Sequence, residues 1–100
     1  MLTKEDILDF LRNNKSDLAT AYHIRNIGII GSYARDEQGG KSDIDFIIEF
    51  NENVEDIFEA KFKLRQFLQS NLKRNVDICR KKYLKPFAKD SILKEAIYGW

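Results

Sequence analysis

Residues 24–50 read IRNIGIIGSYARDEQGGKSDIDFIIEF, and this stretch decides the fold. Residues 24–30 are rich in β-branched side chains and stop at Gly31, which predicts a buried strand. A polar loop with two adjacent glycines follows. Residues 43–50 are again β-branched and aromatic, which predicts a second strand. We therefore expect two strands that are joined through a turn beginning with glycine.

Helices are expected before and after these strands in the sequence. Thr3 can cap a helix over residues 3–13, with Asp6 in its acidic first turn. Residues 52–72 place apolar side chains mostly at helical spacing, so a long helix is expected to pack on the sheet. These apolar positions are Val54, Ile57, Phe58, Phe62, Leu64, Phe67, Leu68 and Leu72.

The remaining segments complete a small α+β fold. Residues 16–22 fit either a short helix or a loop, because two asparagines, which often end helices, precede them. Residues 75–79 predict a short third strand, and residues 88–98 a last helix that ends at Gly99. This order predicts an α/β sandwich, a small mixed sheet with helices mainly on one face and the other face free for a site.

Length and charge limit the possible functions. The 100 residues (11.7 kDa) fit one domain over 1–100. Lys and Arg total 17 against 16 acids, so the basic excess of a dedicated nucleic-acid-binding module is missing and we expect no direct nucleic-acid binding. The single Cys79 excludes an internal disulfide, and we expect neither a secretory signal nor a membrane span. A cytoplasmic location, without membrane contact, is expected.

Three carboxylates, Asp43, Asp45 and Asp77, are the candidate catalytic and metal-binding residues. Asp43 and Asp45 are two apart on a predicted strand, so their side chains point to the same side of the sheet. Two ionised carboxylates so close repel, which is relieved by a raised pKa or by a divalent cation. Asp77, between two apolar residues of the third strand, is a candidate third ligand. Such a set could hold two Mg²⁺ ions about 3.5 to 4 Å apart, which would clamp the attacking and leaving oxygens of a phosphoryl displacement.

Other interpretations of these acids stay open. Asp43 and Asp45 could simply begin a strand on a wet face. Asp77 could form a structural ion pair with nearby Arg74 or Arg80. As a metal ligand, Asp77 would lie nearest the incoming hydroxyl group and could help to remove its proton.

Gly31 and Ser32 are the candidate nucleotide-binding residues. Glycine lets the backbone approach a phosphate closely, and Ser32 offers a hydroxyl and an amide at what could be a helix N-terminus. No Gly-Lys-Ser/Thr follows, so this is not a Walker loop. Metal binding would then depend on the carboxylates.

Gly31-Ser32, ten residues, and then Asp43-Ile44-Asp45 resemble the motif of the polymerase-β-like nucleotidyltransferase superfamily. Over nearly its whole length the chain is similar to the minimal nucleotidyltransferases, the MntA-like antitoxins that are paired with HEPN-domain ribonuclease toxins. Arg35 also matches the common Gly-Ser-x-Ala-Arg-Gly of these proteins, whereas Asp36 replaces the final glycine.

This resemblance implies a Mg²⁺-dependent transfer of AMP from ATP to a tyrosine of a HEPN toxin. Gly31 and Ser32 would hold the triphosphate, Asp43 and Asp45 the metal ions, and Asp77 would be the third carboxylate. Arg35 could bind phosphate, contact the partner or be a solvated turn residue. Two other functions stay open: a non-catalytic antitoxin that masks its toxin, and a small-molecule nucleotidyltransferase.

Overall fold

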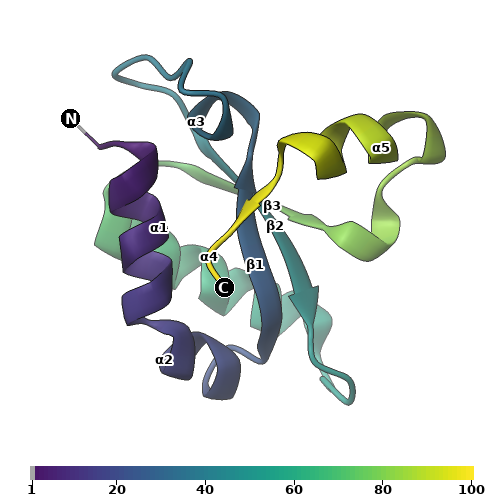
Figure 1. Cartoon of the computed structure of the whole chain (residues 1–100). Helices are drawn as coiled ribbons and strands as arrows, with labels where there is room; N and C mark the ends of the chain where they lie inside the picture. The colour runs from purple at the N-terminus through teal and green to yellow at the C-terminus, as the bar shows by residue number, and fades with distance from the viewer. Residues whose placement is uncertain (1) are drawn as a thin grey trace.

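A computed structural model describes residues 2–100 (Figure 1). The elements in chain order are α1 (Lys4–Asn13), α2 (Lys15–Thr20), β1 (Ile24–Ile30), α3 (Gly31–Ala34), β2 (Ile44–Phe50), α4 (Ile57–Leu72), β3 (Val76–Arg80), the 3-10 helix η1 (Lys81–Tyr83), α5 (Pro86–Glu95) and β4 (Ile97–Tyr98). The three expected strands and the helices that flank them are present, and residues 16–22 are largely helical.

The strands form one mixed sheet in the order β3-β2-β1-β4. β1 runs antiparallel to β2 and to β4, whereas β2 and β3 are parallel. A parallel pair needs a crossover connection, and α4 supplies it between β2 and β3. The predicted α+β fold with a small mixed sheet is confirmed.

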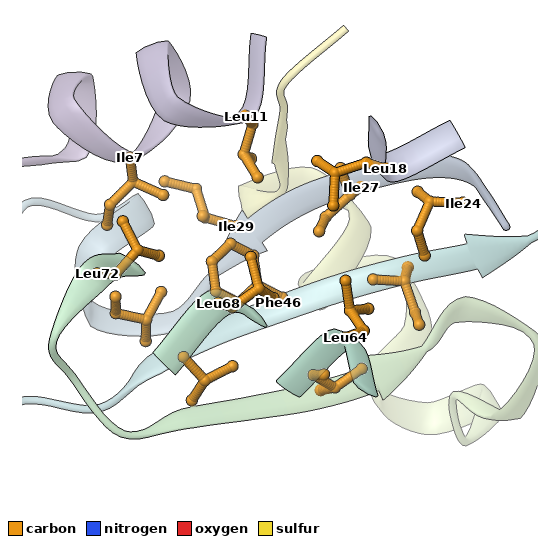
Figure 2. Close-up of a cluster of buried hydrophobic side chains, with 14 of the residues drawn as sticks. Ile7, Leu11, Leu18, Ile24, Ile27, Ile29, Phe46, Leu64, Leu68 and Leu72 are labelled. Atoms are coloured by element: carbon orange, nitrogen blue, oxygen red, sulfur yellow. The ribbon is translucent and has the colours of Figure 1, made fainter. Parts of the chain in front are cut away.

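The hydrophobic core lies between one face of the sheet and the helices that cover it. Successive residues of a strand point to opposite faces, and Phe46 with its alternate neighbours in β2 is buried on the core face. Figure 2 shows side chains of α1, α2 and α4 gathered over this face. The labelled residues are Ile7, Leu11, Leu18, Ile24, Ile27, Ile29, Phe46, Leu64, Leu68 and Leu72. The opposite face therefore carries Asp45 and Glu49 of β2 and Asp77 of β3.

The first helix begins as the sequence predicts. The Asp6 amide donates a hydrogen bond to Thr3 Oγ1 (3.1 Å), and the Thr3 amide donates one to Asp6 Oδ2 (3.0 Å). This reciprocal capping box satisfies two of the amides that a helix N-terminus leaves without intrahelical acceptors.

The helix predicted over residues 88–98 was wrong in its last three residues. The helix ends at Glu95, and Ile97 and Tyr98 form the edge strand β4 beside Gly28 and Ile29 of β1. A helix continuing to residue 98 would leave this side of β1 without hydrogen-bond partners, which strand pairing supplies. The absence of a side chain at Gly28 permits the approach, since a Cβ there would lie 2.8 Å from the Ile97 carbonyl oxygen.

The long helix predicted over residues 52–72 is shorter than expected, and fewer of its apolar side chains pack on the sheet. It begins at Ile57 because Asp56 caps it, accepting a hydrogen bond from the Glu59 amide (3.0 Å). Phe58 and Phe62 are 90% and 57% exposed and do not pack on the sheet. They lie outside the buried stripe of Ala60, Leu64, Leu68 and Leu72.

Candidate active site

Asp45 and Asp77 lie side by side on the open face of the sheet. Each is the second residue of its strand, and the parallel register of β2 and β3 pairs them directly. Their neighbours Phe46 and Ile78 are buried in the core, so the two carboxylates point to the other face. Two of the three acids proposed from the sequence are thus brought together by strand pairing.

Asp43 lies just before β2 rather than within it, and its side chain is exposed. The pKa of Asp45 is raised above its ordinary value of 3.8, mainly because the carboxyl group is partly buried. Repulsion from Asp77, Asp43 and Glu95 adds to this rise, and Arg35 opposes it. The acids therefore form a cluster whose negative charge is incompletely compensated.

The cluster is not a closed ligand set. Among residues 2–100, no three carboxylate, imidazole or thiol side chains converge closely enough to hold a metal ion. The alternative ion pair for Asp77 is wrong, because neither Arg74 nor Arg80 forms a salt bridge with it in the described part of the chain. Arg80 instead lies over Phe50 and Tyr83, with its guanidinium carbon 5.5 and 4.8 Å from the ring centroids.

The turn that follows β1 places the candidate phosphate-binding residues next to these acids. Gly31 adopts a φ of +73°, which glycine tolerates better than other residues. A Cβ at Gly31 would collide with a carboxylate oxygen of Asp45. Ser32 follows as the second residue of α3 and is half-buried. The backbone of the turn and the Asp45 carboxylate therefore lie in contact.

One residue of this site, Glu95, was missed by the sequence reasoning. Its Oε1 accepts a hydrogen bond from the Gly31 amide (3.0 Å), and its Oε2 accepts one from Arg35 Nη1 (2.9 Å). Arg35 Nε also donates to Glu37 Oε1 at 2.6 Å. Hydrogen bonds to Glu37 and Glu95 raise the pKa of Arg35. Arg35 is thus an exposed turn residue held by two acids, and no local pattern in the sequence indicated that Glu95 would reach it.

Asp36 occupies a left-handed backbone position, with a φ of +57°. Aspartate adopts this conformation more readily than most residues other than glycine and asparagine. The Asp36 carboxylate forms a salt bridge with Lys4 Nζ (3.0 Å) on the first helix. The replacement of the glycine that is common in minimal nucleotidyltransferases is therefore compatible with the turn.

Residues 6–98 match a family model that is described as a nucleotidyltransferase domain. The chain belongs to this nucleotidyltransferase family. A provisionally named protein adenylyltransferase of Methanocaldococcus jannaschii, MJ1379, is 38% identical over 99 residues, covering 98% of this chain and 99% of the relative. The protein adenylyltransferase MntA of Thermococcus cleftensis is 33% identical over 98 residues, covering 98% and 97%.

Solved structures of nucleotidyltransferases agree with this assignment. A provisionally named minimal nucleotidyltransferase matches with a TM-score of 0.77 and 27% identity, covering 96% of this chain and 95% of the other. A chain in the complex of a tri-AMPylated HEPN toxin of Shewanella oneidensis with its MNT antitoxin matches with a TM-score of 0.61 and 20% identity, covering 93% and 71%. The resemblance to minimal nucleotidyltransferases and the enzyme class expected from the sequence are confirmed.

No helix within residues 2–100 is long and apolar enough to cross a membrane.

The acid cluster of this nucleotidyltransferase should make its thermal stability depend on pH. In the folded chain the ionised Asp45 carboxylate is partly removed from water and is repelled by Asp77, Asp43 and Glu95, so its charge destabilises the fold. Because the pKa of Asp45 is raised in the folded chain, that chain takes up the proton first as the pH falls, and the destabilisation is lost. In metal-free buffer we expect Asp45→Asn to raise the Tm by about 1 to 3 °C near pH 7, since solvent screens a partly exposed charge.

Thermal unfolding of both proteins across the acidic range measures this difference. The advantage of Asp45→Asn should shrink as the pH falls from neutral into the acidic range in which the folded chain takes up the proton. An advantage that grows on acidification would contradict the sign of the pKa shift.

Proposed function

We propose that this chain is an antitoxin that transfers AMP from ATP to a tyrosine hydroxyl of a HEPN-type toxin and thereby silences it. The observation that carries the proposal is the pairing of Asp45 with Asp77 in contact with the Gly31 turn. Relatives named as protein adenylyltransferases match the chain over nearly its full length, which supports a protein as the acceptor.

Asp43, Asp45 and Asp77 are the carboxylates that would hold two Mg²⁺ ions, although the three do not converge on a single point. Carboxylate oxygens are the ligands that Mg²⁺ prefers, and one or two of them per ion suffice when phosphate oxygens and water complete the shell. The uncompensated charge that raises the pKa of Asp45 is the electrostatic condition that a divalent cation relieves. Bound there, the ions would stabilise negative charge on the attacking and leaving oxygens.

The remaining steps fall to residues of the chain. The turn at Gly31 and Ser32 holds the triphosphate, with the glycine allowing close approach of the backbone. The acceptor oxygen forms a bond to the α-phosphorus as the bond from that phosphorus to pyrophosphate breaks. Asp77 is exposed at the strand edge of the sheet and takes the proton of the incoming hydroxyl. The products are the AMP ester of the acceptor and pyrophosphate.

The test is incubation of the protein with a HEPN-domain toxin, ATP and Mg²⁺, followed by intact-mass analysis. We expect the toxin to gain mass in whole AMP units. Asp43→Asn/Asp45→Asn should abolish the gain, because it removes two charged ligands, whereas Asp90→Asn, an exposed acid of α5, should leave it intact.

Two other outcomes would each overturn the proposal. Unchanged toxin mass, with inhibition surviving the double substitution, would identify an antitoxin that acts by masking its partner. Transfer of AMP to a small hydroxylated compound, but not to the toxin, would identify a small-molecule nucleotidyltransferase.

A further inference from the structure

Glu95 connects the C-terminal part of the chain to the turn at the candidate nucleotide site. It is the last residue of α5, and its partner Gly31 is 64 positions earlier in the sequence. Figure 1 shows α3 and α5 facing each other at one end of the sheet. The Glu95 side chain is only 26% exposed, so its two hydrogen bonds are partly shielded from solvent.

The two oxygens of Glu95 hold opposite ends of α3. Oε1 accepts from the amide of Gly31, the first residue of this helix, and Oε2 accepts from Arg35, the residue that caps its C-terminus. A helix of four residues does not stabilise itself, since nucleation costs more than a single turn returns. The residue before α3, Ile30, offers no side-chain cap. Glu95 is therefore the side chain that supplies the missing acceptor at the start of α3.

The same contact fixes the position of the turn relative to Asp45. Gly31 is held from one side by Glu95 and contacts the Asp45 carboxylate on the other. The salt bridge with Arg35 balances the charge of Glu95. It thereby reduces the repulsion between Glu95 and the three aspartates of the cluster. Release of the Gly31 amide would let the turn move away from the carboxylates.

We propose that Glu95 is a positioning residue for nucleotide binding: it holds the Gly31-Ser32 turn in the conformation that receives the phosphates and orients Arg35 at the edge of the turn. This inference rests on the proposed function only in taking the turn as the phosphate site. Glu95 does not bind phosphate itself, because a carboxylate has no hydrogen to donate to a phosphate oxygen and repels its negative charge. It acts through the backbone of Gly31 and the guanidinium of Arg35.

The first experiment measures binding of a non-hydrolysable ATP analogue with Mg²⁺ by calorimetry, without any toxin. We expect Glu95→Ala to weaken binding about tenfold, because both contacts are lost. Glu95→Gln should weaken it only about threefold, since its amide oxygen still accepts from Gly31 while the ion pair is lost. Asp90→Asn, on the same helix, should bind as the wild type does. A variant that binds the analogue more tightly would show that Glu95 occupies the place of a phosphate, and would overturn the proposal.

Two further measurements separate positioning from general stability. Hydrogen exchange at the Gly31 amide should accelerate in Glu95→Ala and stay slow in Glu95→Gln. In an Arg35→Ala background, Glu95→Gln should cause no further loss of binding, because the ion pair that it removes is already absent. Equal weakening by Glu95→Gln and Glu95→Ala, or a full effect without Arg35, would contradict the assignment. Because no acceptor protein is present, these results stand whether or not the toxin is the substrate.

Discussion

Asp45→Asn is expected to lower the rate of AMP transfer about a thousandfold or more, because it removes the carboxylate at the centre of the acid cluster. Asp45 is the acid that faces both Asp77 and the Gly31 turn. Asparagine keeps the size and one oxygen but not the charge, so metal affinity should fall while the fold persists. The measurement is the initial rate of AMP incorporation into the toxin at saturating ATP.

A second readout ties this loss to the metal. Mg²⁺ should raise the Tm of the wild-type chain by mass action, and it should raise that of Asp45→Asn much less. Asp90→Asn serves as the matched control, with normal activity and a normal response to Mg²⁺. Activity of Asp45→Asn within tenfold of wild type would remove Asp45 from the metal site.

Gly31→Ala is expected to destabilise the chain by about 1 to 3 kcal/mol and to reduce transfer at least about a hundredfold. The backbone at this position has a φ of +73°, which an L-residue with a side chain rarely adopts. The new methyl group would also meet the Asp45 carboxylate, which must then leave its place beside Asp77. Denaturant unfolding and the initial transfer rate test the two effects.

The chain contains a matched control for this change. Gly40 lies in the loop before β2, has no positive φ, and a Cβ there would have open space around it. Gly40→Ala should therefore leave both stability and activity close to wild type. If Gly31→Ala behaved in the same way, the turn would not be held against Asp45 as the structure has it.

The predictable part of the fold follows from runs of β-branched residues and from local spacing. The β-branched run in residues 24–30 and the later one in residues 43–50 each needed only neighbouring residues to be recognised as strands. Asp77 was expected near Asp43 and Asp45 as a third ligand because these acids alternate with apolar residues, and the parallel register of β2 and β3 places it directly beside Asp45. Here the local pattern and the tertiary structure agree.

The features of the fold and site that could not be predicted depend on contacts between distant parts of the chain. Glu95 is one acid of an ordinary amphipathic segment, and only the folded sheet brings it to Gly31. The strand β4 exists because the free edge of β1 accepts it, a tertiary demand that overrides a helical pattern. The exposed Phe58 was expected in the core because a periodic count of apolar residues does not tell which of two faces meets the sheet.

The parallel register of β2 and β3 joins the chemistry of the site to the packing beneath it. A slip of one residue would turn Asp77 into the core and bring Val76 and Ile78 out to solvent. Burial of these two apolar side chains thus excludes a one-residue slip and fixes Asp77 on the same face of the sheet as Asp45. Selection for a well-packed core and selection for a working pair of acids therefore favour the same strand alignment.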